Sequence, residues 1–196
     1  MNRISLNIIF SGVFLLSSCQ TDYAPKPRGF FRIDLPQKNY TLIDTIPAYQ
    51  FESPDYALLS PDDESPWEKN WITINFPEFK GSLHISYKPV DDNLAVYLED
   101  MHTMLIKHLP KASAIQDSLI YAPERDVYGL LFSIQGKSVA SPLQFYLTDS
   151  INHFVRGALY FNIRPNNDSL APVINFLRKD VDHFIETLNW KDQVSN

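Results

Sequence analysis

Two pairs of residues place a carboxylate and an imidazole one helical turn apart, Glu99 with His102 and Asp180 with His183. This spacing supplies part of the ligand set of di-iron helical bundles, where further helices complete the site. The chain is expected to contain only two suitable helices, so the spacing alone does not predict a metal centre. Surface or boundary positions are the simpler interpretation, and we expect no metal and no cofactor.

Nucleophilic catalysis would need a serine, a histidine and an aspartate that meet in space, for example Ser133, His153 and Asp149. However, no serine lies in the glycine-flanked turn of a nucleophile elbow. The six glycines are spread along the chain and form neither a dinucleotide fingerprint nor a phosphate loop. We therefore expect no nucleotide binding, no catalytic residues and no enzymatic activity.

Cys19 is the only cysteine, and its position predicts a covalent modification. Arg3 precedes an apolar run from Ile4 to Leu16, and two serines separate this run from the cysteine. A charged start, a short apolar core and small residues before the cleavage position are typical of a secretory signal peptide. The run is too short for a membrane span of about 20 residues. We predict a lipoprotein signal peptide at 1–18 and acylation of Cys19, with palmitate as one of the chains that anchor it.

The rest of the chain is mildly acidic, because the whole sequence carries a formal net charge of −6. Nucleic-acid binding needs a basic face, so nucleic acid is not an expected partner. With 44% hydrophobic residues, the composition is that of a globular protein, and no cysteine remains for an internal disulfide. We predict a lipidated cysteine and proline-containing tether at 19–28 and a single globular domain at 29–196.

The tether limits how far the domain lies from its membrane. Nine residues of stiff, extended chain, at about 3.1 Å each, reach roughly 28 Å. Lys26, Arg28 and Arg32 either meet anionic headgroups or are simply solvated, and the sequence leaves both interpretations open. A loop is expected from Ser60 to Asn70, and its acidic run lacks the glycine turn of a calcium loop, which favours a solvated loop.

Alternating apolar residues predict β-strands, because side chains in a strand point to opposite faces in turn. The expected strands are 49–51, 56–59, 72–76, 82–87, 128–134, 143–148 and 154–163. Short connections rich in turn residues join the later strands, so an antiparallel meander is the simplest pairing. Tyr128, Leu130, Phe132 and Ile134 should share one face of the sheet.

In two stretches the apolar residues recur at the spacing of one face of a helix. The first stripe consists of Leu94, Leu98, Met101, Leu105 and Leu109. The second consists of Leu170, Val173, Leu177, Val181, Phe184 and Leu188. Asp92 or Asn93 is expected to cap the first helix, and Asp168 with Ser169 the second. One-sided helices and one-sided strands must bury each other, so we predict an α+β fold with a largely antiparallel sheet covered by two main helices. By analogy, this order of elements resembles the Mog1/PsbP-like sandwiches.

Several long motifs resemble a known family of lipoproteins. They include Tyr23–Pro36 (YAPKPRGFFRIDLP), Phe79–Lys88, Tyr97–Asp100, Gln144–Ser150 and Phe154–Asn162 (FVRGALYFN). Together with Arg164-Pro165 and the start of the last helix, they are similar to the gliding-motility lipoprotein GldD family. The resemblance implies a lipoprotein that is needed for surface gliding and linked to the type IX secretion machinery. It implies no assigned enzymatic activity, so no catalytic residues are carried over.

We therefore expect a non-enzymatic structural or partner-binding component of the gliding machinery. The alternative is a periplasmic module that binds envelope glycan or peptide, or a hydrolase of the cell envelope. The expected location is the outer membrane, with the domain facing the periplasm, which follows from the family and from Gln20 not being an aspartate. The expected partners are the membrane, through acylated Cys19, and other gliding or secretion lipoproteins or envelope proteins.

Aromatic and arginine side chains near the tether predict a docking segment. Arg28, Phe30, Phe31 and Arg32 combine the residue types that most often anchor interfaces, next to prolines that restrict the unbound chain. The competing interpretation is that Phe30 and Phe31 begin the fold and pack on their own sheet.

Overall fold

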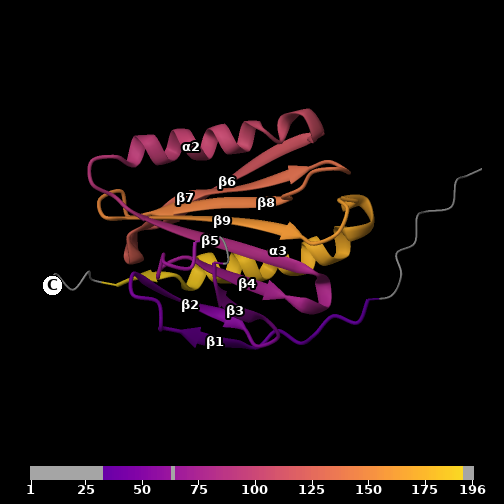
Figure 1. Cartoon of the computed structure of the whole chain (residues 1–196), viewed down its shortest axis with the longest axis horizontal. Coiled ribbons are helices and arrows are strands. Elements are labelled where there is room, and N and C mark those ends of the chain that lie inside the picture. Colours follow the sequence, from indigo (N-terminus) through magenta and orange to yellow (C-terminus); the bar gives the residue numbers. More distant parts are fainter. Residues whose placement is uncertain (1–32, 63–64, 192–196) are drawn as a thin grey trace, which may run out of the picture. The chain divides into compact units, whose positions relative to one another are not determined.

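The computed structural model describes residues 33–62 and 65–191 of the chain, all of which fall within one compact unit, Arg32–Asn196. Two helices are described, α2 (Leu94–Ile106) and α3 (Asn167–Thr187) (Figure 1). The strands are β1 (Tyr40–Ile43), β2 (Tyr49–Pro54), β3 (Leu58–Pro61), β4 (Ile72–Phe76), β5 (Gly81–Pro89), β6 (Ala114–Ala122), β7 (Val127–Gln135), β8 (Leu143–Thr148), β9 (His153–Phe161) and β10 (Asn189–Trp190). Short 3-10 turns lie at Pro77–Phe79, Leu109–Lys111 and Pro123–Arg125.

The described strands form two antiparallel sheets. The larger has seven strands in the order β3-β4-β5-β9-β8-β7-β6, and the smaller has three in the order β1-β2-β10. The predicted meander of β7, β8 and β9 is present, and β4 pairs antiparallel with β5 as a hairpin. The predicted α+β class with a largely antiparallel sheet is confirmed.

The two helices cover opposite faces of the large sheet. Leu131 of β7 lies in the main core with Leu177 of α3, whereas Ile134 of the same strand packs in a separate cluster with Leu105 of α2. Residues three positions apart in a strand point to opposite faces, so the helices must lie on either side. Figure 1 shows this arrangement, with α2 and α3 on the two sides of strands β6 to β9.

The main core joins the small sheet to the large one through α3. Phe184 of α3 lies with its ring 4.5 Å from that of Phe51 in β2 and 5.6 Å from that of Phe145 in β8. Tyr49 of β2 also packs on Tyr87 of β5 at 6.2 Å. These rings are almost fully buried. The small sheet therefore shares one hydrophobic core with α3 and the large sheet.

Gly157 in β9 has a packing reason for its lack of a side chain. It lies opposite Phe145 of β8 in the sheet register. A Cβ added at this position would lie only 2.2 Å from the ring of Phe145. A glycine inside a strand often marks such a close approach, and here it makes room for a buried aromatic ring.

Some predicted boundaries were wrong. The first helix ends at Ile106, so Leu109 falls in the following 3-10 turn, where it is 54% exposed rather than part of the buried stripe. The second helix begins at Asn167 with Asn166 in the N-cap position, and Asp168 and Ser169 lie inside its first turn. The edge strand β6 was missed, because its outward side chains, such as Leu119, are apolar yet exposed.

Neither helix in the described ranges combines the length and the apolar character that crossing a membrane requires.

Candidate functional site

The residues singled out for lipidation and docking lie outside the described part of the chain. This applies to Cys19, Arg28, Phe30, Phe31 and Arg32, and their roles stay predictions. The segment that follows them, residues 33–39, has no regular secondary structure. Ile33 and Leu35 in this segment are 38% and 44% exposed, so apolar side chains face solvent directly after the predicted docking residues.

A buried carboxylate fastens the end of this segment to α3. Asp180 of α3 is only 3% exposed, and Nζ of Lys38 lies 2.6 Å from its Oδ1. Tyr40 donates a hydrogen bond to the same oxygen at 2.9 Å, and Tyr56 donates to Oδ2. The ammonium group of Lys38 also lies 3.6 Å from the centre of the Phe176 ring. We call Lys38, Tyr40, Tyr56 and Asp180 the Asp180 cluster.

The electrostatics of the Asp180 cluster keep its hydroxyl groups as donors. Burial raises the pKa of Tyr56 and Tyr40, and the hydrogen bonds to the Asp180 carboxylate raise it further. The pKa of Lys38 is lowered, because burial and the nearby charge of Lys179 together outweigh the neighbouring carboxylate, which raises it. The Asp180 carboxylate accepts three donors from its own chain, so its hydrogen-bonding capacity is occupied by partners within the fold. Its role is to hold these segments together.

Asp180 and His183 do not act as a pair, and the expected surface or boundary position is wrong for Asp180, which is buried. His183 Nε2 lies 2.7 Å from Oε2 of Glu52 in β2, and the imidazole stacks on the ring of Tyr40 at 3.7 Å. The other pair, Glu99 and His102, lies on the exposed side of α2. Across the described ranges, no cluster of three or more His, Cys, Asp or Glu side chains is arranged to hold a metal ion.

Ser133, His153 and Asp149 do not assemble either. Ser133 accepts a hydrogen bond from Nη1 of Arg178 at 2.7 Å. His153 Nδ1 lies 2.9 Å from the Tyr87 hydroxyl. Each of the three side chains has a structural partner elsewhere, so the arrangement has no charge-relay geometry.

Asp149 organises the turn between β8 and β9. Its Oδ1 accepts the backbone N–H groups of Ile151, Asn152 and His153 at 3.0, 2.8 and 2.8 Å. Burial acts to raise the pKa of this carboxyl, but the three backbone donors outweigh burial and hold the pKa below its usual value.

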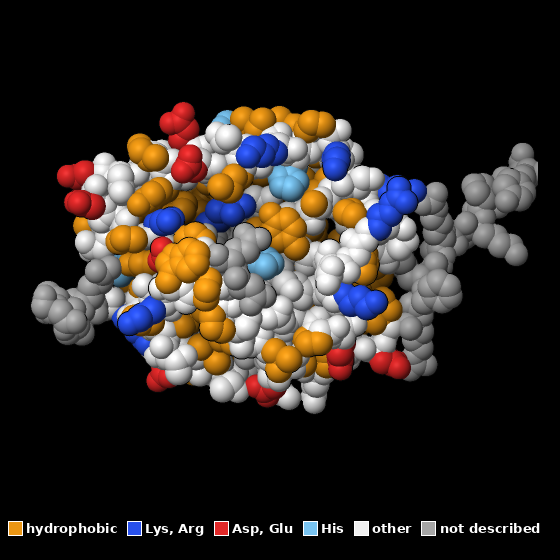
Figure 2. All heavy atoms as spheres, in the orientation of Figure 1, with side chains coloured by type: hydrophobic (Ala, Val, Ile, Leu, Met, Phe, Trp, Pro, Cys, Tyr) orange, Lys and Arg blue, Asp and Glu red, His pale blue; other side chains and the backbone are white. Residues whose placement is uncertain are grey.

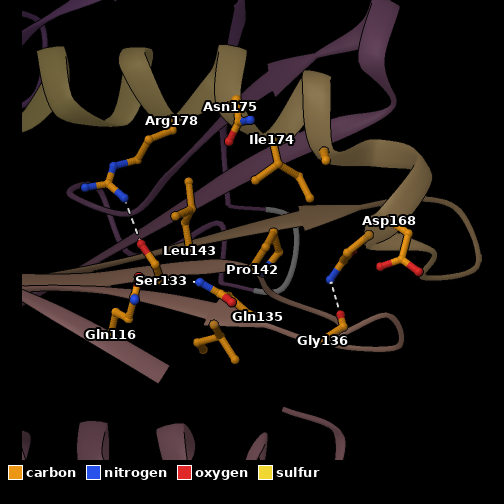
Figure 3. Close-up of a pocket in the computed structure, with 13 residues that line it drawn as sticks. Gln116, Ser133, Gln135, Gly136, Pro142, Leu143, Asp168, Ile174, Asn175 and Arg178 are labelled. Carbon is orange, nitrogen blue, oxygen red and sulfur yellow. Dashed lines mark hydrogen bonds between the residues drawn. The ribbon is translucent and has the colours of Figure 1, made fainter. Parts of the chain in front are cut away.

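A cavity of about 380 Å³ lies between α3 and strand β7 (Figure 3). Figure 3 shows Arg178 reaching from the helix to Ser133 on the strand. The same guanidinium donates to Asp182 at 2.8 Å, and Asn167 donates to the carbonyls of Gly136 and Val139. Arg178 forms an ion pair with Asp182 of its own helix, so its positive charge in this cavity is already neutralised.

A second hollow lies on the other face of the large sheet, beneath α2. It has a volume of about 460 Å³, and we call it the α2 groove. Its lining residues are Asp62, Trp71, His84, Ile85, Ser86, Lys88, Tyr97, Asp100, Met101, Met104, Phe154, Arg156 and Tyr160. Strands β5 and β9 form its floor, where the small side chain of Ser86 lies opposite Arg156 in the register. Helix α2 forms its roof.

The cations of the α2 groove are not matched in the way that Arg178 is. Within residues 33–62 and 65–191, Arg156 contacts only neutral atoms, Sδ of Met101 at 3.3 Å and Oε1 of Gln144 at 3.5 Å. Nζ of Lys88 lies 4.8 Å from the centre of the Trp71 ring. Figure 2 shows basic, histidine and hydrophobic side chains gathered side by side on the face below α2. The groove combines aromatic surface with positive charge.

A family model described as gliding motility lipoprotein GldD matches residues 20–190. The chain belongs to this family. It is therefore a membrane-anchored lipoprotein with a role in gliding motility, as the sequence motifs implied. The match includes both the Asp180 cluster and the α2 groove of this GldD-family chain, and it begins at the residue after Cys19.

Two further comparisons add little about function. A search of curated protein sequences found no match to this GldD-family chain. Among solved structures, the chain is similar to the solution structure of cyanobacterial PsbP (CyanoP) from Synechocystis sp. PCC 6803. The identity is 11%, the match covers 86% of this chain and 100% of that one, and the TM-score is 0.46.

The α2 groove was missed by sequence reasoning, although a signal was present. Three of the motifs that resemble the GldD family contribute to it: Phe79–Lys88 and Phe154–Asn162 to the floor, and Tyr97–Asp100 to the roof. The polar or charged residues His84, Ser86 and Lys88 alternate along β5 and thus share one face. A face of this kind beneath a helix could have been identified as a polar groove, had the packing of α2 on β9 been known.

Proposed function

We propose that this GldD-family lipoprotein acts without enzymatic activity, as a structural and partner-binding component of the gliding machinery associated with type IX secretion. The observation that carries the proposal is the α2 groove, in which the Arg156 guanidinium contacts only neutral atoms among the described residues. Aromatic residues, methionine and arginine are enriched where proteins bind one another. The groove supplies all three beside an unmatched positive charge.

The proposed location is the outer membrane, with the domain facing the periplasm. The anchor is acylated Cys19, and the signal peptide at 1–18 is removed. A tether of roughly 28 Å keeps the domain near the membrane and near other envelope lipoproteins.

The non-enzymatic part of the proposal is supported by the partners of the candidate catalytic side chains. Ser133 is held by Arg178, Asp149 by three backbone N–H groups, and Asp180 by its lysine and two tyrosines. A nucleophile or general base must instead lie within hydrogen-bond reach of the group that it activates. These side chains are used to organise the fold.

A second candidate function is binding of envelope glycan or peptide. The size of the α2 groove favours it, because pockets of about 300–1,000 Å³ are typical of small-molecule sites. No described feature favours hydrolysis in the same way.

Photocrosslinking in gliding cells tests the proposal. A photoreactive amino acid is placed at Met104, on the roof of the α2 groove, and a matched one at Lys179, on the opposite side of the domain. We expect Met104 to capture a defined protein of the gliding or secretion machinery that Lys179 does not capture. Hydrolysis of isolated envelope glycan by the purified protein would contradict the proposal, as would cells in which neither position captures any such component.

A further inference from the structure

We propose that the α2 groove binds a short peptide segment that carries a carboxylate beside an apolar side chain. Arg156 and Lys88 hold the carboxylate, and the aromatic and methionine side chains of the groove hold the apolar group. The proposal rests on the partner-binding function in one respect, namely that the partner supplies the peptide.

The guanidinium of Arg156 is half-buried and lacks an anionic partner within the described residues. Its two contacts, to a thioether sulfur and an amide oxygen, are weaker than the charge-assisted bonds that a guanidinium forms with a carboxylate. Two other arginines are matched within the fold. Arg178 pairs with the carboxylate of Asp182, and Arg125 pairs with the carboxylate of Glu124. Arg156 thus keeps its capacity for a carboxylate that comes from outside.

Lys88 places a second positive charge on the same face of the sheet. It lies two positions beyond Ser86, which is opposite Arg156 in the register, so the two cations occupy neighbouring positions on the groove floor. Its ammonium group lies over the Trp71 ring, and it forms no ion pair in the described part of the chain. A carboxylate that enters the groove can therefore approach two cations at once.

The acidic residues of the groove, Asp62 and Asp100, do not neutralise the positive charges of Arg156 and Lys88. Asp62 accepts the backbone N–H of Ser65 at 2.9 Å and lies 3.8 Å from Nδ1 of His84. Asp100 is exposed on α2 and forms no ion pair with Arg156 or Lys88. These two carboxylates thus lie at the rim or are already engaged, while neither cation has an ion-pair partner in the part of the chain that the structure describes.

The roof of the groove selects for an apolar group next to the carboxylate. Met101 and Met104 present flexible thioether chains, which adapt to apolar side chains of different shapes. The Tyr97 hydroxyl is already bonded to the Pro89 carbonyl and to the Asn93 amide. A sugar ring would leave several hydroxyl groups unpaired against this roof, which is unfavourable, whereas a peptide side chain would not.

A binding experiment with the purified, full-length lipidated protein in detergent micelles tests the proposal. The probes are a library of tripeptides that contain one glutamate and one phenylalanine, leucine or methionine, and a matched library with glutamine in place of glutamate. We expect glutamate peptides to bind, glutamine peptides to bind on the order of tenfold more weakly, and Arg156→Gln to weaken binding of the glutamate library by a similar factor. Lys179→Gln, which removes an exposed charge from α3, should bind like the wild type.

A second variant tests the groove independently, in case Arg156→Gln does not fold. Met104 is 40% exposed, so Met104→Glu adds a negative charge at the groove without emptying the core. It should keep the wild-type melting temperature and lose affinity for the glutamate library. Equal binding of the two libraries, or wild-type affinity in both Arg156→Gln and Met104→Glu, would overturn the proposal. Tighter binding of N-acetylmuramic acid than of any tripeptide would also overturn it and would indicate a glycan site.

The two proposals can fail separately. If the tripeptides do not bind but the Met104 photocrosslink still captures a gliding protein, the peptide proposal is wrong and the proposed function stands. If the tripeptides bind as expected but no component of the machinery is captured in cells, the proposed function is wrong and the ligand chemistry of the groove stands.

Discussion

The ammonium group of Lys38 donates to the carboxylate of Asp180 at 2.6 Å, and the two residues are 142 positions apart in the chain. This bond ties the segment that follows the predicted tether to the middle of the last helix. Tyr40 and Tyr56 complete the coordination of the same carboxylate. Mechanical tension on the lipid-anchored N-terminal segment would act on the domain near the Asp180 cluster, where these bonds oppose it.

Replacing Asp180 by asparagine should destabilise the fold. The substitution keeps the size of the side chain but removes the charge that accepts three donors, one of them cationic. Leaving buried polar groups imperfectly paired costs about 1–3 kcal/mol. Urea unfolding of the variant measures this loss. The control is Asp182→Asn, two positions away in an exposed ion pair with Arg178, which should cost no more than about 1 kcal/mol. Equal losses in both variants would contradict a special role for Asp180.

The two helical stripes should differ in their contribution to stability. Leu177 is fully buried in the main core, whereas Leu105 belongs to the small cluster beneath α2. Leu→Ala at buried sites costs about 2–5 kcal/mol, and we expect Leu177→Ala to lie near the upper end and Leu105→Ala near the lower. Leu109→Ala, at an exposed position of the predicted stripe, should leave the melting temperature nearly unchanged. A reversed order of the three variants would mean that the assignment of the two cores is wrong.

His108 should make stability depend on pH. Burial lowers its pKa from the usual 6.5, and the positive charges of Arg156 and Lys111 lower it further. Its Nε2 lies 2.8 Å from the amide nitrogen of Gln144, a bond that needs the neutral ring. Because the folded-state pKa is depressed, this contribution is present above about pH 6.5 and is lost as the pH falls through the folded-state value. Unfolding free energies between pH 7.5 and 5 should fall less steeply in His108→Gln than in the wild type. An NMR titration midpoint above 6.5 for His108 would rule this out.

Cys19→Ser should abolish lipidation. Without the thiol there is no acceptor for the acyl chain, and the precursor should stay unprocessed or mislocalised. Incorporation of radiolabelled palmitate in cells measures this directly. Ser17→Ala keeps the cysteine and a small residue before the cleavage position, so it should label like the wild type. Equal labelling of Cys19→Ser and wild type would show that the anchor lies elsewhere.

The docking segment can be separated from the fold by one triple variant, with Phe30, Phe31 and Arg32 all replaced by serine. If these side chains bind a partner, the purified variant should keep its melting temperature, while gliding and partner crosslinks are lost. Ile33 and Leu35, the nearest described apolar side chains, are exposed to solvent, which favours this outcome. Early melting would instead show that the segment packs on its own sheet.

Most of the strands and both helices could be predicted because their patterns are local. Alternation along β4, β5 and β7 and the stripe of α3 depend only on which side chains one face must bury. Strand β6 broke this rule. As an edge strand it pairs with β7 alone, and Leu119 and Tyr121 on its outer face stay exposed, so hydrophobicity did not follow burial. The start of α3 was misplaced because Asp168 and Ser169, whose side chains suit an N-cap, lie inside its first turn.

The sequence by itself determined the predicted lipid anchor, the α+β class and the family, because each depends on residues that are close together or on motifs that are long. The tertiary structure alone decided which partners the polar side chains have. Asp180 and His183 are neighbours on one helix, yet the first binds Lys38 and the second binds Glu52. The α2 groove likewise takes Lys88, Met104 and Arg156 from three elements. Charge and hydrogen bonding act over a few ångströms in space, and the packing of distant segments sets which groups lie within that range.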